Sequence, residues 1–296
     1  MKLINQSYEI CKTHGYTLQD VYKDIERAAR VSYKSEDKIT EDSAEKMVQR
    51  LISMKHYSPL EFGTIYLKAK LIPCWDILRK KNKNLSKPWV YVEQVDEKEE
   101  DGSIGRYWYI TTNYRFIVEN GLEDLLQYMC EPTEHHQKRT TVKFITNRTV
   151  SHELVRHRSM SFMQESQRYV AYDKDKFGKE LTFIKPAWKQ PEWPEWNEQA
   201  NETVLMHLLF VSIENTYMKL RTLGLTPQQA RTVLPNATKT ELYMCGFDKD
   251  WEHFFDLRDK TNVDPQMYDL AHPLHEEFNK TKHEKISEQE RETENG

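Results

Sequence analysis

Apolar residues recur every three to four positions in several segments of the chain, which is the spacing of one face of an α-helix. Residues that favour helix ends bound these segments: a hydroxyl, amide or carboxylate before the first turn, and glycine or proline after the last. The apolar stripes are typical of helices that pack against a core or a subunit interface. Helices are expected at 18–31, from Thr40 to before Pro59, from Asn147 towards Arg156, at 197–223 before Gly224, in a short turn between Thr226 and Pro235, from Asp248 to Leu257, and from Asp264 onwards.

Alternating or aromatic-rich segments predict strands elsewhere in the chain. These segments lie at 64–72, near Tyr91, and at 107–110, 142–145 and 238–244. Residues 159–167 are expected to be extended or looping, and 186–196 form a connector rich in proline and tryptophan. The tail, residues 279–296, has almost no apolar residues and is predicted to be disordered.

Composition limits the kinds of partner that the chain can bind. With 296 residues the chain can bury a large core, in one or two domains. A net charge of −4 gives no general attraction to nucleic acid, so any anion must be bound by a local cluster of Arg and Lys. No apolar run approaches the ~20 residues that span a bilayer, and the N-terminus lacks the apolar centre of a signal peptide. We therefore expect a cytoplasmic protein that binds neither membranes nor nucleic acid.

Metal and thiol chemistry have weak support in the sequence. Four scattered cysteines form no CxxC pair, so reduced and mostly buried thiols are expected. His152 and His157 are five residues apart, whereas a zinc-binding HExxH helix needs a spacing of four. The adjacent His135 and His136 lie in a polar segment without further ligands and are predicted to be exposed to solvent. No metal site is expected.

The segment from Val150 to Val170 carries the strongest functional signal. It places Arg156, His157 and Arg158 side by side, and Ser166 and Arg168 follow after a spacer of seven residues. Guanidinium groups match phosphate and carboxylate oxygens in pairs, so such a cluster suits an anionic ligand. A solvated charge run is the alternative, but the flanking residues are apolar or aromatic. With Arg231 and Arg258 the chain offers five candidate arginines, so either two anions bind or some arginines pair only with acids.

The spacing Arg-His-Arg, seven residues, Ser is similar to the signature of the flavin-dependent thymidylate synthases. Gln164, Ser166, Arg168 and Tyr169 extend the resemblance within the segment. Further similar stretches follow in the family's order, at residues 29–33, 56–61, 230–235 and 254–258. Phe247, Lys249 and Asp256 depart from residues found in some members.

This resemblance implies reductive methylation of dUMP to dTMP. Methylenetetrahydrofolate would donate the carbon, FAD would be the bound cofactor, and NADPH would supply the reducing equivalents. The implied fold is α+β, an antiparallel sheet wrapped by helices, in a homotetramer whose active sites are shared between subunits. Residues 1–278 would form a single domain, with an insertion at about 73–139 before the helix that carries the Arg-His-Arg motif. The insertion is expected to be a solvated subdomain or an oligomer contact.

The resemblance also implies roles for individual residues. Arg258 would be the catalytic residue, bonding the uracil ring and stabilising the charge that develops there. Ser166 would bind through its hydroxyl and not act as a nucleophile, and no cysteine lies in the similar motifs. The flavin would contact His56, Ser58, Arg156, His157, Arg158, Gln164, Lys249 and His253. The nucleotide would contact Glu153, Arg156, Gln164, Glu165, Ser166, Gln167, Arg168, Arg231 and Arg258.

Three alternative functions stay open at the level of sequence. Arginines that bind phosphate do not choose a base, so another pyrimidine nucleotide is one possible substrate. The same arginines, with Tyr and Trp as stacking groups, also suit an RNA-binding protein. An inactive relative would bind flavin without binding nucleotide.

Overall fold

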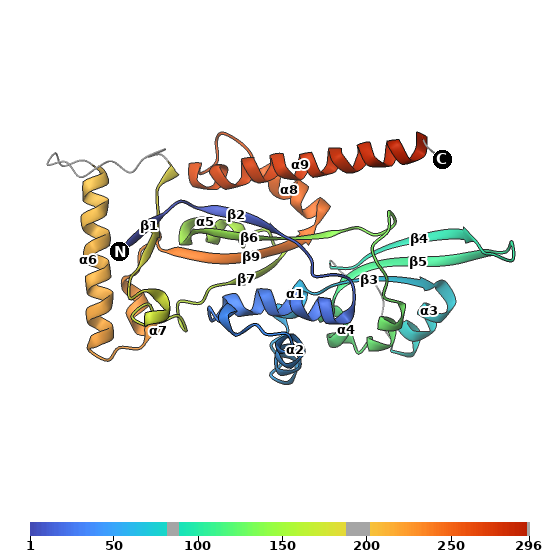
Figure 1. Cartoon of the computed structure of the whole chain (residues 1–296), viewed down its shortest axis with the longest axis horizontal. Coiled ribbons are helices and arrows are strands. Elements are labelled where there is room, and N and C mark those ends of the chain that lie inside the picture. The colour runs from blue at the N-terminus through green and yellow to red at the C-terminus, as the bar shows by residue number, and fades with distance from the viewer. Residues whose placement is uncertain (82–88, 188–201, 295–296) are drawn as a thin grey trace.

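The computed structural model describes residues 1–81, 89–187 and 202–294, with side chains described as far as Lys280 (Figure 1). The strands are β1 (Lys2–Ile4), β2 (Ser7–Cys11), β3 (Thr64–Lys70), β4 (Tyr91–Lys98), β5 (Ile104–Asn113), β6 (Arg139–Asn147), β7 (Ser161–Gln164), β8 (Thr182–Ile184) and β9 (Lys239–Phe247). The α-helices are α1 (Leu18–Val31), α2 (Ser43–Ser53), α3 (Leu71–Lys80), α4 (Tyr114–Asn120), α5 (Arg148–Leu154), α6 (Glu202–Thr222), α7 (Pro227–Ala230), α8 (Asp248–Arg258) and α9 (Pro265–Glu294). Short 3-10 helices are η1 (Glu36–Lys38), η2 (Ser58–Phe62), η3 (Glu123–Tyr128), η4 (Asp175–Phe177) and η6 (Arg231–Val233).

An antiparallel sheet of order β2-β6-β9-β7 lies at the centre of the fold. Because side chains alternate between the two faces of a strand, neighbouring residues of β9 enter different cores. Leu242 and Met244 pack with residues of α5, α8 and α9, whereas Tyr243 and Cys245 pack with Ala28 of α1 and its neighbours. The sheet is therefore covered by α5, α8 and α9 on one face and by α1 on the other (Figure 1). This agrees with the expected antiparallel sheet wrapped by helices.

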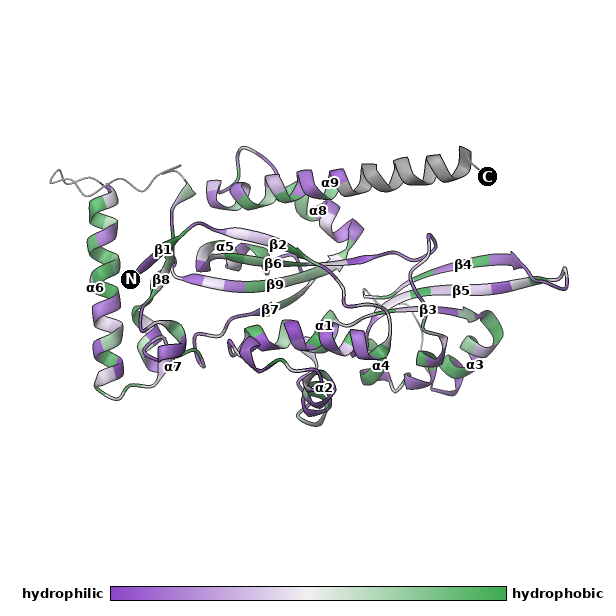
Figure 2. Ribbon diagram, in the orientation of Figure 1, coloured by the Kyte–Doolittle hydropathy of each residue, from purple (hydrophilic) through white to green (hydrophobic). Residues whose placement is uncertain are grey.

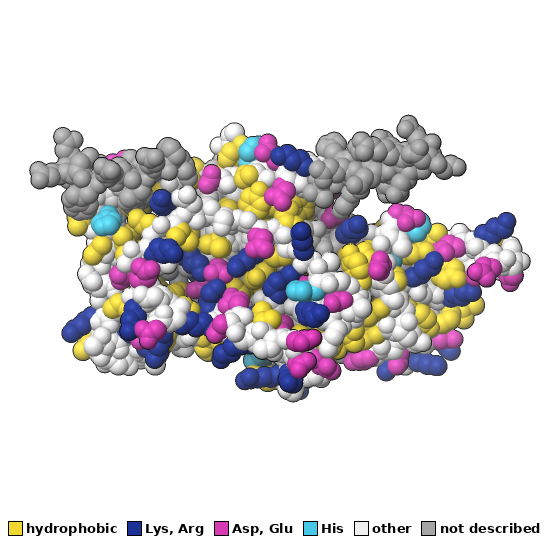
Figure 3. All heavy atoms as spheres, viewed as in Figure 1, with side chains coloured by type: hydrophobic (Ala, Val, Ile, Leu, Met, Phe, Trp, Pro, Cys, Tyr) yellow, Lys and Arg dark blue, Asp and Glu magenta, His cyan; other side chains and the backbone are white. Residues whose placement is uncertain are grey.

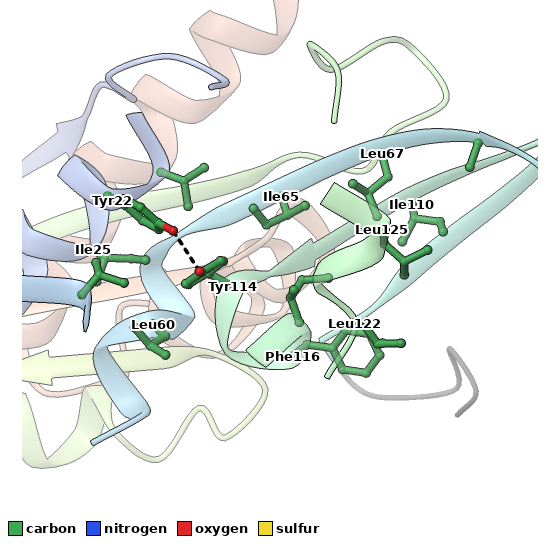
Figure 4. Close-up of a cluster of buried hydrophobic side chains, with 14 of the residues drawn as sticks. Tyr22, Ile25, Leu60, Ile65, Leu67, Ile110, Tyr114, Phe116, Leu122 and Leu125 are labelled. Carbon is green, nitrogen blue, oxygen red and sulfur yellow. Dashed lines mark hydrogen bonds between the residues drawn. The ribbon is translucent and has the colours of Figure 1, made fainter. Parts of the chain in front are cut away.

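A second antiparallel sheet, of order β3-β5-β4, contains two strands from the predicted insertion. Its apolar residues share one core with α1 and α2, in which Ile25, Leu60, Ile110 and Leu125 are fully buried (Figure 4). The hydroxyls of Tyr22 and Tyr114 are 3.0 Å apart and join α1 to α4 within this core. Cys74, Leu78, Ile110 and Leu125 of this segment are thus buried in one core with the N-terminal helices.

Several predicted helix ends are confirmed by their capping bonds. Asn147 Oδ1 accepts a hydrogen bond from Val150 N at 2.8 Å, and Thr226 forms a capping box with Gln229. Gly224 follows α6 with a positive φ of 91°, the conformation that glycine adopts at no steric cost. Asp264 Oδ1 accepts from Gln266 N at 2.7 Å and begins α9. Residues 188–196 of the expected connector and 197–201 of the expected long helix lie outside the described residues.

Three local predictions differ from the structure. The strand expected at 64–72 ends at Lys70, because α3 begins at Leu71 with Pro73 in its first turn, where proline is tolerated. Thr40 does not cap α2, because the helix begins only at Ser43 and Asp42 occupies the N-cap position. α9 continues to Glu294 through the segment expected to be disordered. Residues 279–294 contain no Gly or Pro and many Glu and Lys, which have high helix propensity.

The prediction that His136 is exposed is wrong, because its side chain is only 5% exposed. Its Nδ1 accepts from Thr133 N at 3.1 Å, and Nε2 donates to Leu67 O at 3.1 Å. The ring packs edge-on against Tyr66 and Tyr109, so the loop before β6 folds over the second sheet. Burial lowers the pKa of His136, which keeps the imidazole neutral.

α6 keeps a strongly apolar surface exposed (Figure 2). Its inner side packs on β8 and the neighbouring loop, with Phe210 stacked on Phe183 at 4.4 Å between ring centroids. Leu205, Leu208 and Leu209 on its outer side are each more than half exposed. Contiguous exposed leucines of this kind favour an interface with another chain.

Charged side chains of both signs are interspersed over the face seen in Figure 3. No described helix is both long enough and apolar enough to cross a membrane.

The shared core of the second sheet predicts that a cavity in the inserted segment destabilises the whole domain. Leu125 of η3 is 1% exposed, so Leu125→Ala is expected to lower the free energy of unfolding by about 2–5 kcal/mol. Urea unfolding followed by fluorescence and circular dichroism measures this change. Glu123→Ala, an exposed residue of the same 3-10 helix, is the control. If the unfolding curve of Leu125→Ala shows a separate transition at lower urea concentration and an unchanged main transition, the segment folds independently.

Candidate active site

The Arg-His-Arg motif follows the C-terminus of α5. The helix ends at Leu154, and His157 N donates to Leu154 O at 3.2 Å, which continues a turn beyond it. His157 is 8% exposed, whereas Arg156 and Arg158 point to solvent. No hydrogen bond or ion pair joins the side chain of either arginine to another residue that the structure describes. Along the motif, one exposed arginine thus precedes the buried imidazole of His157 and one follows it.

Arg258, the last residue of α8, meets the end of α5. Its Nη1 lies 2.5 Å from Glu153 Oε2, and its Nε lies 3.2 Å from His157 Nε2. The side chains of Arg258 and Glu153 are 17% and 25% exposed. The structure therefore brings together three of the predicted site residues from segments about a hundred positions apart.

His157 is held in its neutral form. Burial, followed by the charges of Arg258, His253 and Arg156, lowers its pKa from 6.5 to about 4. The guanidinium can donate only, so Nε2 of His157 must be the unprotonated acceptor and the remaining proton lies on Nδ1. The ring also packs edge-on against Phe254 of α8, with 5.0 Å between ring centroids. Because the neutral imidazole of His157 accepts a hydrogen bond from Arg258 Nε, it fixes the direction of the Arg258 side chain.

A second group of polar residues surrounds Thr240 on β9. The hydroxyl oxygen of Thr240 accepts from Gln164 Nε2 at 3.1 Å and from Arg148 Nη1 at 3.5 Å. Arg148 N also donates to Asn236 O at 2.9 Å, which ties the start of α5 to the loop after Arg231. Burial and the charge of Arg231 lower the pKa of Arg148. Sequence reasoning missed Arg148, although it directly follows the predicted N-cap Asn147 and begins the helix that leads to Arg156.

Glu165 lies inside the protein, with 3% of its surface exposed. Its Oε2 is 3.0 Å from Lys239 Nζ, and its Oε1 accepts from the Tyr172 hydroxyl at 3.1 Å. The same lysine also pairs with Glu241, which Lys34 and Lys143 contact at 2.8 and 3.0 Å. Both oxygens of Glu165 are occupied by the protein itself, so its position favours a structural role over direct contact with a nucleotide.

The loop after β7 brings Ser166, Gln167 and Arg168 next to α1 and α7. Ser166 N donates to Ser32 O at 3.2 Å, and Arg168 Nε donates to Gln228 Oε1 at 3.2 Å. Nε2 of Gln167 is a buried donor that has no partner in the described parts of the chain. Arg231 follows α7 in η6 and is half-buried, as predicted for a residue held in a short, bounded turn.

Four predicted flavin residues lie outside these groups. Lys249 and His253 are exposed on α8, and the His253 ring lies 6.4 Å from that of His157. His56 lies just before η2 and Ser58 begins it, and both are exposed. Phe62 of η2 packs with α1 on the face of the central sheet that α1 covers. No contact within the described ranges joins His56 or Ser58 to Arg258. One chain therefore does not assemble the full predicted set in one place.

The remaining chemistry-bearing residues offer little else. Within the described residues, no group of three or more His, Cys, Asp or Glu side chains could hold a metal ion. Cys74 and Cys245 are buried, Cys11 and Cys130 are half-buried, and all four are free thiols. Burial raises the pKa of Cys11 and of Cys74 to about 11, which keeps both thiols protonated.

Residues 94–282 match the family described as thymidylate synthase complementing protein. This match begins inside the segment that was predicted to be an insertion. The flavin-dependent thymidylate synthase of Pyrococcus furiosus is 28% identical over 183 residues, which cover 59% of this chain and 70% of the relative. The probable flavin-dependent thymidylate synthase of Paramecium bursaria Chlorella virus 1 is 29% identical over 141 residues, covering 47% of this chain and 65% of the relative. The flavin-dependent thymidylate synthase of Thermococcus onnurineus is 30% identical over 157 residues, which cover 52% of this chain and 59% of the relative.

Among solved structures, the UMP/dUMP methylase PolB from Streptomyces cacaoi, bound with 5-Br dUMP, superposes with a TM-score of 0.41 at 16% identity. The superposition covers 95% of this chain and 93% of that chain. Because the family match extends over more than half of its residues, this chain belongs to the thymidylate synthase complementing protein family, which supports the resemblance drawn from its motifs.

Proposed function

We propose that the chain is a flavin-dependent thymidylate synthase that methylates dUMP to dTMP reductively. In this proposal methylenetetrahydrofolate donates the carbon, NADPH supplies reducing equivalents, and FAD is the bound cofactor. The names of the family and of its relatives support a flavin and this reaction. The resemblance of the motifs supports the two co-substrates, and we propose a cytoplasmic location with them.

The observation that carries the proposal is an unequal distribution of charge among the arginines. Glu153 neutralises Arg258 at 2.5 Å. No carboxylate of the described chain pairs with Arg168 or Arg231, and Arg148 beside them contacts only the Thr240 hydroxyl through its side chain. A dianionic phosphate is bound best by the arginines that lack a carboxylate. A neutral ring carbonyl is matched by a guanidinium whose charge is already balanced.

Arg258 is suited to the pyrimidine ring in this arrangement. A guanidinium has five N–H donors, and the bonds to Glu153 and His157 use two of them. The remaining donors are fixed in direction before a ligand arrives, so they can stabilise negative charge that develops on a uracil oxygen. Glu153 and His157 then act by orienting Arg258. Ser166 and Gln167 would position the nucleotide beside it.

The exposed cations near the motif fit a dinucleotide cofactor. Arg156 and Arg158 have no carboxylate partner among the described residues, and Lys249 and His253 are exposed on the adjacent helix. Such groups suit the pyrophosphate and its flanking oxygens. FAD, when bound, supplies the hydride chemistry, while the protein binds and orients the reactants. Gln164 donates to the Thr240 hydroxyl, and in this proposal it contacts both the flavin and the nucleotide.

His56 and Ser58 require a second subunit in this proposal. They belong to or adjoin η2, which packs on the face of the central sheet opposite to α5 and α8, so they would reach the flavin of a neighbouring protomer. A homotetramer with shared sites provides that arrangement. The exposed leucines of α6 are one surface that such an assembly would bury.

Replacing Arg258 tests the assignment to the nucleotide. Arg258→Ala is expected to reduce tritium release from C5-labelled dUMP by at least about 100-fold, because one preorganised donor is typically worth that much. FAD absorbance of the purified variant should match that of the unmodified protein. Arg106→Ala removes an exposed arginine of β5 that pairs with Asp96 and serves as the control. Loss of flavin with unchanged dUMP affinity would show that Arg258 belongs to the cofactor site.

The depressed pKa of His157 predicts a pH-dependent loss of stability. The unfolded chain takes up a proton near pH 6.5, whereas the folded imidazole does so only near pH 4, so folding is disfavoured as the pH falls between these values. The stability of the protein relative to His157→Gln should therefore decrease by about 3 kcal/mol between pH 7 and pH 4. Urea unfolding across this range measures the difference, with His56→Gln, an exposed histidine, as the control. Parallel curves for the protein and His157→Gln would contradict a buried neutral imidazole.

A further inference from the structure

Asp259 follows Arg258 and ends α8. Its N–H donates to Phe255 O at 2.9 Å, and its φ of −92° and ψ of 65° take the chain out of the helix. The carboxylate is 15% exposed. A negative side chain at a helix C-terminus is opposed by the helix dipole, so it needs compensating partners.

Two histidines of α9 provide those partners. His272 Nδ1 lies 2.9 Å from Asp259 Oδ1, and His275 Nδ1 lies 2.6 Å from Asp259 Oδ2. Each carboxylate oxygen is therefore bound by a different imidazole. Burial alone would raise the pKa of Asp259, but His275 and His272 bring it below its usual value. The other charged groups nearby are Glu276, 3.9 Å from His272 Nε2, and the neighbouring Lys260.

Both imidazoles are oriented by aromatic rings. His275 stacks on Phe255 of α8 with 4.4 Å between centroids and an interplanar angle of 10°. His272 stacks on Tyr268 of α9 at 5.0 Å and 10°. Phe255 belongs to the buried core between α8, α9 and the sheet. The Asp259 carboxylate is consequently fixed to α9 through groups that are themselves anchored in the core.

We propose that Asp259, bound by His272 and His275, is a positioning residue that holds Arg258 in place against Glu153 and His157. The last turn of a helix has unsatisfied carbonyls and frays unless it is fastened. Arg258 is in that turn, and displacements of about 1 Å at a reacting group are costly for catalysis. The bonds to α9 fasten the turn immediately after Arg258. The catalytic consequence rests on the function proposed above, but the positioning of Arg258 does not.

The titration of His157 reports the position of Arg258 without any ligand. In full-length protein labelled with 13C at histidine Cε1, NMR gives the pKa of His157 in the free enzyme. Besides Arg258, the charged groups facing this imidazole are His253 and Arg156. Asp259→Ala is expected to raise the pKa of His157 by about 0.5–1 unit, because a displaced guanidinium no longer opposes protonation of the ring. Asp259→Asn keeps one acceptor oxygen and should give a smaller rise.

A double replacement tests the histidines while preserving the stacking. His272→Phe with His275→Phe removes both donors but keeps aromatic rings on Tyr268 and Phe255, so it should raise the pKa of His157 as Asp259→Ala does. Lys260→Ala, an exposed neighbour of Asp259, should leave the titration unchanged. In an Arg258→Ala background, Asp259→Ala should add no further shift.

Two outcomes would overturn the proposal. One is a pKa of His157 in Asp259→Ala that equals its pKa in the unmodified protein. This result would mean that Asp259, His272 and His275 only stabilise the fold, even if the variant has a lower thermal stability. The other is a further shift in the Arg258→Ala background, which would show that Asp259 acts on His157 by another route. In tritium-release assays, Asp259→Ala should lower kcat about 10-fold or more with flavin retained, and an unchanged kcat would contradict the catalytic consequence of the positioning. An unmodified protein that releases no tritium would refute the proposed function and leave the titration test valid.

Discussion

The antiparallel pairing of β6 with β9 determines where the candidate site forms. Arg139 pairs with Phe247 and Asn147 pairs with Lys239. The last residue of β6 and the last residue of β9 therefore lie at opposite ends of the strand pair. α5 starts directly after β6, and α8 starts directly after β9. Because both helices pack on the same face, they run towards each other from the two ends. α5 has seven residues and α8 has eleven, so the two helices extend about 10 and 16 Å. Together they are nearly as long as a nine-residue strand, which extends roughly 30 Å.

This geometry makes two helix C-termini meet over the sheet. Each C-terminus carries partial negative charge, and cations placed there relieve the repulsion. Arg156 and Arg158 follow one helix, and Arg258 ends the other. The contact of Arg258 with Glu153 and His157 closes the gap between them. Asp259 would restore the repulsion if it were unpaired, and its two imidazole partners on α9 compensate for it.

Sequence patterns predicted the helices and strands more completely than the way in which they pack together. The apolar stripe at 18–31, the Asn147 cap and the Thr226 capping box are local signals, and each is seen in the structure. Long-range effects were less accessible. His136 looked like a loop residue because nothing near it in sequence reveals that Tyr66 and Tyr109 cover it. The short strands β1 and β8 pair across some 180 positions and carry no distinctive periodicity.

The sequence predicted which residues form the candidate site, but not the contacts among them. The family's motifs named Glu153, His157 and Arg258, yet the contacts among them follow from the strand register. Arg148 and Asp259 lie in or beside recognised motifs, and their roles appear only when Thr240, His272 and His275 are placed next to them. Glu165 fell within the motif, but Lys239 and Tyr172 bind both of its carboxylate oxygens. It directly follows β7, and its N–H donates to Glu241 O at 2.8 Å, which holds it beside β9.

In the proposed function the arginines have separate roles, with Arg258 facing the uracil ring and the arginines without a carboxylate partner facing the phosphate. A crystal structure of the full-length protein with FAD and dUMP distinguishes these roles. We expect a donor of Arg258 at about 2.7–3.2 Å from a uracil oxygen, with its bonds to Glu153 and His157 intact and the phosphate against Arg231. A phosphate bound to Arg258, or a uracil ring away from it, would show that the roles are assigned wrongly.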